Sequence, residues 1–419
     1  MTRAWLVLLH RYVGLVLAAF LVLAGLTGAL LVWHEELDAA INPHWMRVEP
    51  PVDRHAPPTL SRLELRERVQ RAYPDAWVHW VPLRQGAPDQ ALSFWIEGAP
   101  DASGRHVDLG VDEVFVNPHT GDVLGARRWG DIGQGVGNLM PFIYRLHHSL
   151  ALGTVGTWVF GVVALLWTLD CFVGAWLTFP ARSRTDQGAA GVSARLSRWA
   201  PAWKLRWRGG IYKLNFDVHR AGGLWPWAML LVLAWSSVAF NLYEPVYKPV
   251  TGAVLDIAPD PREQLPRRHD EQPDPAMGWA AALTAARQHM AAVATQKGLQ
   301  LLGEERFSYD AHRGLVRLEV TSNRDVSERR GRTAVFVDAT NGQLLATRMP
   351  TGEAAGDTVT TWLLTLHMAH VWGLPFRLLM TLLGAVVALL SLTGVIIWWR
   401  KRAARRHPPS ARGAVRHST

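Results

Sequence analysis

Four histidines lie at the edges of long apolar segments and form two pairs that recur along the chain. His10 and His219 are each followed by Arg, and each opens an apolar run, at a sequence offset of 209 (219 minus 10). His147 and His367 each follow Leu, at a sequence offset of 220 (367 minus 147). Neutral imidazole is a common ligand of transition metals. The pattern predicts two similar halves in tandem, and two metal or cofactor sites built from one histidine of each half.

The segments that must position these histidines have the composition of membrane spans. The chain has 419 residues, of which 49% are hydrophobic and 21 are Trp. A helix needs about 20 mostly apolar residues to cross a bilayer. Four such runs predict an integral membrane protein with four transmembrane helices: Leu8 to Trp33, Thr157 to Phe179, Leu224 to Leu242, and Phe376 to Trp399.

The positive charges predict the orientation of these spans. Cytoplasmic loops of membrane proteins carry an excess of Lys and Arg. Such residues flank the first span (Arg3, Arg11), fill the loop between the second and third (Arg182, Arg184, Arg195, Arg198, Lys204, Arg206, Arg208, Lys213) and follow the fourth (Arg400, Lys401, Arg402, Arg405, Arg406). We expect both termini in the cytoplasm of a bacterium, a multi-pass inner-membrane location, and contact with anionic lipid but no nucleic-acid partner.

Two extramembrane segments of about a hundred residues each are then expected in the periplasm. Each combines a helical pattern with alternating strands, and each has a strand, a Gly-containing turn and a second strand near Gly121 or Gly342. We expect two small α+β domains. Pro-rich and charged stretches at 49–58 and 259–275 are expected to be linkers, and the tail after Arg400 is expected to be disordered.

The domain organisation that follows alternates membrane and periplasmic parts. It consists of a transmembrane helix at 8–33, a periplasmic domain at 34–145, a transmembrane helix with a periplasmic extension at 146–179, a basic cytoplasmic loop at 180–217, a transmembrane helix at 218–243, a second periplasmic domain at 244–360, a transmembrane helix with a periplasmic extension at 361–400, and a cytoplasmic tail at 401–419.

Haem is the cofactor that best suits the paired histidines. Parallel repeats in a membrane are related by an axis along the membrane normal, so equivalent residues lie at equal depth and can face each other. Two imidazoles on opposite faces of haem iron favour electron transfer over oxygen binding. The only cysteine, Cys171, rules out a Cys-x-x-Cys-His attachment, so two non-covalent haem b groups are expected. Arg11 and Arg220 are candidate partners of the propionates.

Glycines next to the first pair are expected to make room for the cofactor. Gly14 and Gly223 each follow their histidine four positions later and would let the macrocycle lie close to the backbone. The intramembrane acid Asp170 is costly without a partner, and we expect it to bond to a ligand histidine or a neighbouring helix.

The periplasmic ligands have competitors. His34, His148 and His370 lie near the periplasmic ends of the expected spans, as His147 and His367 do, and could replace them as iron ligands or line a substrate site. A straight helix from His147 to Phe179 would be about 48 Å long. It would place the histidine at or above the membrane interface, unless the helices bend near Gly153 and Pro375.

These pieces together resemble the PepSY-associated transmembrane family over nearly the whole chain. The resemblance rests on the Leu-His-Arg and Val-His-Arg sequences around His10 and His219, on Leu-His at His147 and His367, and on the two strand-turn-strand segments. It implies PepSY-like periplasmic domains and a similarity to iron-regulated, di-haem ferric siderophore reductases of the inner membrane. The four paired histidines would then be the haem ligands.

The function expected is an oxidoreductase that moves electrons across the membrane to a periplasmic ferric siderophore or other ferric chelate, releasing Fe(II) for uptake. The electron donor would be quinol or a cytoplasmic protein, because no flavin or nicotinamide site is evident. No catalytic acid or base is required. Two alternatives remain open: a membrane-anchored periplasmic module that binds or inhibits another protein, and a metal-ion permease.

Overall fold

The helical part of the protein is built from apolar segments that continue beyond the expected spans. The computed structural model describes residues 2–50, 60–101, 103–181, 188–265, 267 and 271–406. The tail after residue 406, residues 51–58 of the first expected linker, residues 266 and 268–270 of the second, and Arg182 and Arg184 of the basic loop lie outside these residues. Three described helices are long and apolar enough to cross a membrane: α1 (Arg3–Leu31), α6 (Gly153–Thr178) and α13 (Gly373–Arg406). The protein is therefore a multi-pass helical membrane protein.

The third expected span is two helices, which corrects the prediction of one helix over 218–243. The helices α8 (Ile211–Leu224) and α9 (Trp227–Asn241) meet at an angle of 67° and pass as a span only when taken together. Pro226 lies at the break, where it has no N–H to donate to the carbonyl four positions earlier, and its own backbone is not helical. His219 consequently lies on α8, on the other side of the bend from most of the apolar run.

The second and fourth expected spans are continuous as α6 and α13, but each is separated by a break from the helix before it, close to where a bend was expected. The helix α5 (Leu139–Ser149) ends before α6, and α12 (Ala355–His367) ends before α13. Left-handed residues lie in the connections, and Gly153 and Gly373, which begin α6 and α13, also have positive φ, 57° and 56°. A straight helix cannot continue through such conformations. The breaks place His147 and His367 at the ends of short helices, so neither segment forms one straight rod.

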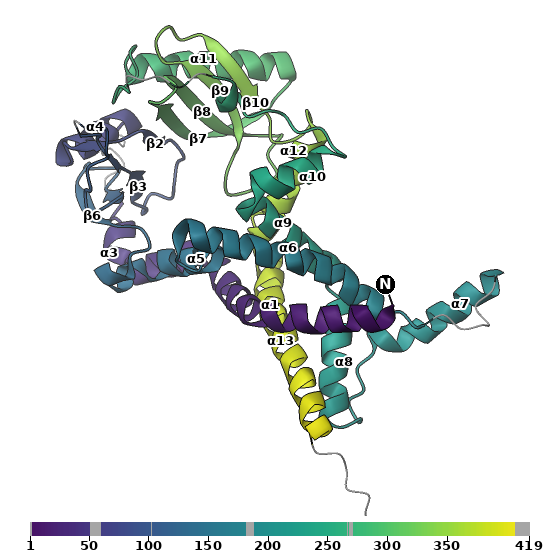
Figure 1. The fold of residues 1–419 in the computed structure, drawn as a ribbon. Helices are drawn as coiled ribbons and strands as arrows, with labels where there is room; N and C mark the ends of the chain where they lie inside the picture. The colour runs from purple at the N-terminus through teal and green to yellow at the C-terminus, as the bar shows by residue number, and fades with distance from the viewer. Residues whose placement is uncertain are drawn as a thin grey trace, which may run out of the picture.

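The helices α1 and α13 cross in close contact, as Figure 1 shows. At the crossing, a Cβ added to Gly25 would lie 2.5 Å from the carbonyl oxygen of Gly384, and the reverse distance is also 2.5 Å. Glycine at both positions lets the two backbones meet, as small residues do in membrane helix pairs. This contact joins the first span directly to the last.

The first extramembrane segment follows α1 through the short helices α2 (His34–Ile41) and α3 (Pro43–Met46). Its remaining elements are α4 (Arg62–Ala72), β1 (Ala76–Trp77), β2 (Trp80–Pro82), β3 (Leu92–Trp95), β4 (Glu97–Gly98), β5 (Glu113–Val116), β6 (Val123–Arg127), η1 (Ile132–Gln134) and η2 (Val136–Asn138). A buried cluster fixes α2 against this segment: Arg127 bonds Asp38 at 2.8 Å and Glu113 at 2.7 Å. Because all three charges are paired, their burial is tolerated.

The second extramembrane segment follows α9. It comprises the π-helical turn η4 (Tyr243–Tyr247), α10 (Lys248–Gly252), η5 (Pro261–Gln264), α11 (Trp279–Lys297), β7 (Leu301–Asp310), β8 (Leu315–Ser322), β9 (Thr333–Asp338) and β10 (Leu344–Arg348). On the opposite side of the membrane helices, α7 (Gly188–Trp199) and η3 (Ala200–Trp203) lie between α6 and α8 in the chain.

The two segments share one sheet, which the sequence did not predict. The five-stranded sheet has the order β10-β9-β8-β7-β2, and β2 of the first segment pairs antiparallel with β7 of the second, Val81 opposite Phe307. A single hydrophobic core contains Leu65 and Phe94 of the first segment together with Phe307 and Val335 of the second. The segments therefore pack as one extramembrane body.

Two hairpins have the same turn in the two segments. In the β5–β6 hairpin, Gly121 N–H donates to Asn117 O, and in the β9–β10 hairpin, Gly342 N–H donates to Asp338 O. Both glycines have positive φ, 76° and 73°, which other residues adopt at a cost. The Gly-containing turns expected from the sequence are thus present.

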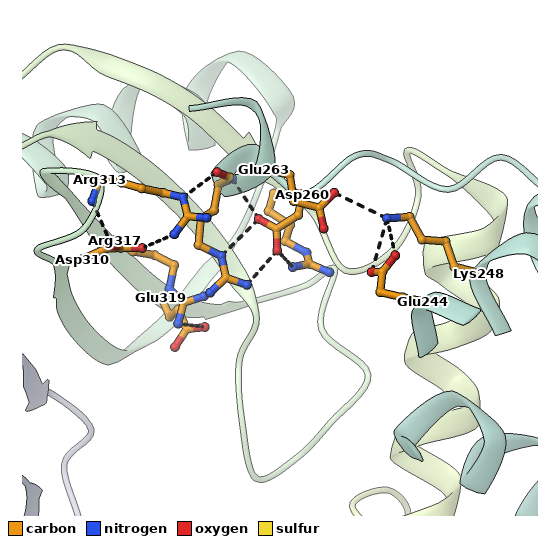
Figure 2. Close-up of polar contacts among 10 residues, drawn as sticks. Glu244, Lys248, Asp260, Glu263, Asp310, Arg313, Arg317 and Glu319 are labelled. Carbon is orange, nitrogen blue, oxygen red and sulfur yellow. Dashed lines mark hydrogen bonds and ion pairs between the residues drawn. The ribbon is translucent and has the colours of Figure 1, made fainter. Parts of the chain in front are cut away.

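The sheets lie at one end of the helices, whereas the start of α1, α7 and the end of α13 lie away from them (Figure 1). Charged side chains connect the sheets to the helices, as Figure 2 shows. Lys248 of α10 bonds Glu263 of η5 at 3.4 Å, and nearby Asp260 bonds Arg262 at 2.7 Å and lies 3.9 Å from Arg348 of β10. Within the second extramembrane segment, these contacts tie η5 to α10, the short helix near the end of α9, and to β10 of the sheet.

Candidate functional site: two pairs of histidines

The first pair of histidines comes from two helices of different halves. His10 of α1 and His219 of α8 have ring centres 6.1 Å apart, with their planes at 51°. Both rings are held from behind: His10 Nδ1 lies 2.9 Å and 3.0 Å from the two carboxylate oxygens of Asp170, and His219 Nδ1 lies 3.0 Å from the carbonyl oxygen of Leu390. A carbonyl or carboxylate oxygen only accepts, so Nδ1 carries the proton in each ring. Nε2 is left free to bind a metal.

Glycines on the adjacent helices let these rings lie close to the backbone. A Cβ added to Gly174 of α6 would lie 3.3 Å from Cε1 of His10, and one added to Gly394 of α13 would lie 3.1 Å from Cε1 of His219. Both distances are tighter than ordinary carbon contacts. The two glycines have a sequence offset of 220 (394 minus 174), the same as that of His147 and His367.

A cavity of about 450 Å³ opens between the helices at this pair. Its volume lies in the usual range of small-molecule sites. Gly14 and Gly223, the glycines expected to make room for a cofactor, line it, and neither would bring an added Cβ within 4 Å of another group. Its walls are mostly apolar, with basic side chains at Arg3, Arg11, Arg220 and Lys401.

The two arginines expected at the propionates differ in their surroundings. Both Arg11 and Arg220 line the cavity. Arg220 also bonds Asp217 at 2.9 Å and the carbonyl oxygen of Pro201 at 2.9 Å, so it helps to hold η3 against α8. A propionate at this edge would thus meet one arginine already fixed in place.

The second pair comes from two other helices, α5 and α12, and lies near the opposite end of α1. His147 of α5 and His367 of α12 have ring centres 6.3 Å apart, with their planes at 70°. His147 Nδ1 lies 2.9 Å from Thr27 Oγ1, and His367 Nδ1 lies 2.7 Å from Ser236 Oγ. Each hydroxyl already donates its single proton to a carbonyl, that of Leu23 or Val232. Each must therefore accept from Nδ1, which again leaves Nε2 free.

The spacing of both pairs fits a metal held between two imidazoles. With metal–nitrogen bonds of ~2 Å, two imidazoles on opposite sides of one metal have ring centres roughly 6 Å apart. Within the described ranges, no group of three or more His, Cys, Asp or Glu side chains is arranged to hold a bare metal ion. Two imidazoles with free Nε2 atoms are the ligand set for a metal whose remaining positions a macrocycle fills. The residues present therefore fit haem.

The distance between the pairs follows from α1, which is continuous. It carries both His10 and Thr27, the partner of His147, at a sequence offset of 17 (27 minus 10). At ~1.5 Å per residue this offset corresponds to roughly 25 Å, a little less than the hydrocarbon thickness of a bilayer. The two pairs therefore lie near opposite edges of the membrane part.

Three other histidines lie near the second pair without joining it. His148 bonds the carbonyl oxygen of Tyr144 at 2.9 Å, and His370 follows α12 in the connection to α13. The ring of His34 packs edge-on against Tyr144, 6.1 Å between centres, and its buried Nε2 has no partner among the described residues. The structure thus brings His147 and His367 together and leaves these three outside the pair.

Sequence reasoning missed the hydroxyl partners of the second pair. Thr27 and Ser236 have a sequence offset of 209 (236 minus 27), the same as that of His10 and His219. A hydroxyl residue at that repeat distance inside two apolar runs was a signal that could have identified them. The partner of Asp170 is now also defined, because its carboxylate accepts from His10.

The fold and these pairs define a class of protein: a multi-pass helical membrane protein with an extramembrane α+β body and two sites formed by facing imidazoles. The chain belongs to the family described as the PepSY-associated TM region, which matches residues 7–401. The resemblance found in the sequence is confirmed at this level. No curated protein matches the chain.

Proposed function

We propose that this protein is a haem-dependent oxidoreductase of the bacterial inner membrane. It moves electrons across the membrane to a ferric siderophore or another ferric chelate in the periplasm, and Fe(II) is released for uptake. Two haem b groups are held by His10 with His219 and by His147 with His367. Quinol or a cytoplasmic protein supplies the electrons.

The observation that carries this proposal is the geometry of the two histidine pairs. Ring centres at 6.1 Å and 6.3 Å match two imidazoles on one metal, and in all four rings Nδ1 is bonded to an acceptor. Second-shell bonds of this kind fix the orientation of a metal-binding imidazole and raise its basicity. A histidine that only packed in a core would also bond its N–H, but it would not need a second imidazole at this distance.

The residues would do three things for a bound cofactor. The paired imidazoles would hold the iron and would leave no open position for oxygen. Arg11 and Arg220, at the edge of the first cavity, would bind the propionates. The apolar walls would exclude water. Bound there, haem b supplies reversible one-electron transfer.

The periplasmic chemistry asks little of the protein beyond positioning. Hard oxygen donors of a chelator hold Fe(III) more tightly than Fe(II), so one electron weakens the complex without breaking the chelator. Such a transfer needs no acid or base. The extramembrane body lies at the end of the helices where His147 and His367 are found, and we assign the substrate to that side.

The topology proposed with this function has both termini in the cytoplasm and two tandem halves. Basic residues at the end opposite the sheets support this orientation. Repeated offsets support the duplication: His10 and Thr27 each have a counterpart at an offset of 209, and His147 and Gly174 each have one at an offset of 220. On this basis the two strand-turn-strand segments belong to PepSY-like domains.

The first test is the optical spectrum of the purified full-length protein, oxidised and reduced with dithionite, with a pyridine haemochrome count. We expect two low-spin b haems in the wild type and one in each of His219→Ala and His367→Ala. His148→Ala is the matched control and should keep both, because His148 bonds only a backbone carbonyl next to the pair. A colourless wild type from haem-replete cells would overturn the proposal.

A further inference from the structure

The four paired histidines are not held by the same kind of acceptor. His147 and His367 are held by neutral hydroxyls, and His219 by a backbone carbonyl, with the hydroxyl of Thr393 at 3.2 Å. His10 alone among the four is held by a carboxylate, that of Asp170. The two sites therefore differ by one negative charge in contact with a ligand ring.

Asp170 is an unusual residue for its position. It lies in the apolar helix α6, its side chain is 12% exposed, and it lines the first cavity. An acid within a membrane span is costly unless it is bonded to a partner. Here both carboxylate oxygens face His10 Nδ1. The equivalent position in the second half is Leu390 (170 plus 220), which has no charge to offer, so the carboxylate belongs to one half only.

The contact between Asp170 and His10 should stabilise the ferric state of a bound iron over the ferrous state. A carboxylate that accepts a hydrogen bond from Nδ1–H makes the imidazole a stronger electron donor than a carbonyl or hydroxyl acceptor does. Its negative charge also favours the more positive ferric state of a nearby iron, and the effect is larger in a medium of low dielectric constant. Second-shell hydrogen bonds and burial are established means by which proteins set haem potentials.

Taking the haem sites of the proposed function as given, we infer that Asp170 lowers the reduction potential of the site held by His10 and His219 below that of the site held by His147 and His367. Asp170 is then a positioning and tuning residue that acts through His10. An iron held by His10 and His219 would then give one electron, and be oxidised from ferrous to ferric, more readily than an iron held by His147 and His367, which would take it up and be reduced from ferric to ferrous. Transfer toward the periplasmic side is downhill.

Cations in the first cavity would raise the reduction potential of an iron bound there, which is opposite to the effect of Asp170. Arg3, Arg11, Arg220 and Lys401 line it and would favour the ferrous state, although haem propionates would neutralise part of this charge. These side chains remain unchanged when Asp170 alone is substituted. A comparison of Asp170→Asn with the wild type thus isolates the carboxylate charge, because Asn keeps an acceptor oxygen and nearly the same shape.

The test is a potentiometric titration of the purified full-length protein, followed optically. The wild type should give two waves, and the lower should be the one lost in His219→Ala. In Asp170→Asn the lower wave should shift to more positive potential, while the upper wave and the haem count stay the same. Asp170→Glu, which keeps the charge, should resemble the wild type more closely than Asp170→Asn does.

The outcomes separate this inference from the function on which it rests. A wild type without haem overturns the proposed function itself. Two haems with an unmoved lower wave in Asp170→Asn, or a shift confined to the upper wave, overturn only the role of Asp170. If Asp170→Asn does not fold, the titration of His219→Ala still tests the inference. Loss of the higher-potential wave in His219→Ala would contradict it.

Discussion

Thr27 and Ser236 make the same contact in the two halves of the chain. Each hydroxyl donates to the carbonyl oxygen four positions earlier in its helix and accepts from the Nδ1 of a histidine on another helix, His147 or His367. A hydroxyl has one proton, so the bond to the carbonyl fixes the histidine tautomer. Thr27 and Ser236 therefore both leave the Nε2 atom of their histidine unprotonated and free at the second site.

Removal of either hydroxyl should loosen the second site. In Thr27→Val and Ser236→Ala the Nδ1–H loses its acceptor, and loss of such second-shell partners weakens metal binding by about 10-fold to 100-fold. We expect one of the two haems to leave the protein at least about tenfold faster, measured as transfer to excess apomyoglobin. Ser237→Ala is the control, because Ser237 bonds only the carbonyl oxygen of Leu233. Equal rates in Ser236→Ala and Ser237→Ala would contradict the assignment.

A bulky residue at Gly14 or Gly223 should block the first site without harming the fold. Both glycines lie on helices and face the cavity, and an added Cβ meets nothing within 4 Å. Leu favours a helix over Gly by about 1 kcal/mol, so the apoprotein should not be destabilised. Gly14→Leu and Gly223→Leu should each bind one haem in place of two by haemochrome count. Two full haems in these variants would show that the macrocycle does not occupy this space.

The crossing of α1 and α13 should not tolerate a side chain at Gly384. A Cβ there would lie 2.5 Å from the carbonyl oxygen of Gly25, and backbone must move to admit it. Overpacking of this kind costs about 1–3 kcal/mol. Gly384→Val should lower the thermal unfolding midpoint in detergent, whereas Gly223→Ala, a helical glycine in open space, should not. An unchanged midpoint for Gly384→Val would mean that the helices do not cross at these glycines.

The extramembrane body should lose stability in acid through Asp260. Burial by itself raises the pKa of Asp260, but hydrogen bonds from Arg262 and the charge of Arg348 lower this pKa from 3.8 to about 2. A carboxyl whose pKa is lower in the folded state stabilises the fold above its unfolded pKa, and this contribution is lost as the pH falls through the folded pKa. Asp260→Asn should therefore cost roughly 1 kcal/mol at neutral pH, after allowance for solvent screening.

The measurement for Asp260 is the unfolding midpoint as a function of pH. The difference between wild type and Asp260→Asn should be constant near neutral pH and should shrink as the pH falls from about 4 toward 2. Glu244→Gln is the control, since the pair of Glu244 with Lys248 is exposed and should contribute little (Figure 2). A difference that grows in acid would have the wrong sign for this argument.

The amino-acid sequence was sufficient to predict a multi-pass membrane protein of this family and to single out four paired histidines. Runs of apolar residues predict membrane helices because the hydrocarbon layer has a fixed thickness, and Gly121 and Gly342 predict turns because few other residues adopt positive φ. The repeated sequence offsets placed His10 with His219 and His147 with His367. All of these signals are local or periodic, so they can be found without knowing the packing.

Other features could be seen only in the folded protein, because they depend on contacts between distant residues. The choice of His147 and His367 over His34, His148 and His370, the bond from His10 to Asp170, and the pairing of β2 with β7 all join residues far apart in the chain. The sequence has a proline at position 226, but it did not predict the 67° bend between α8 and α9. Contacts of this kind depend on which surfaces remain to be buried after the helices and strands have formed. A local sequence pattern does not predict which distant surfaces will meet.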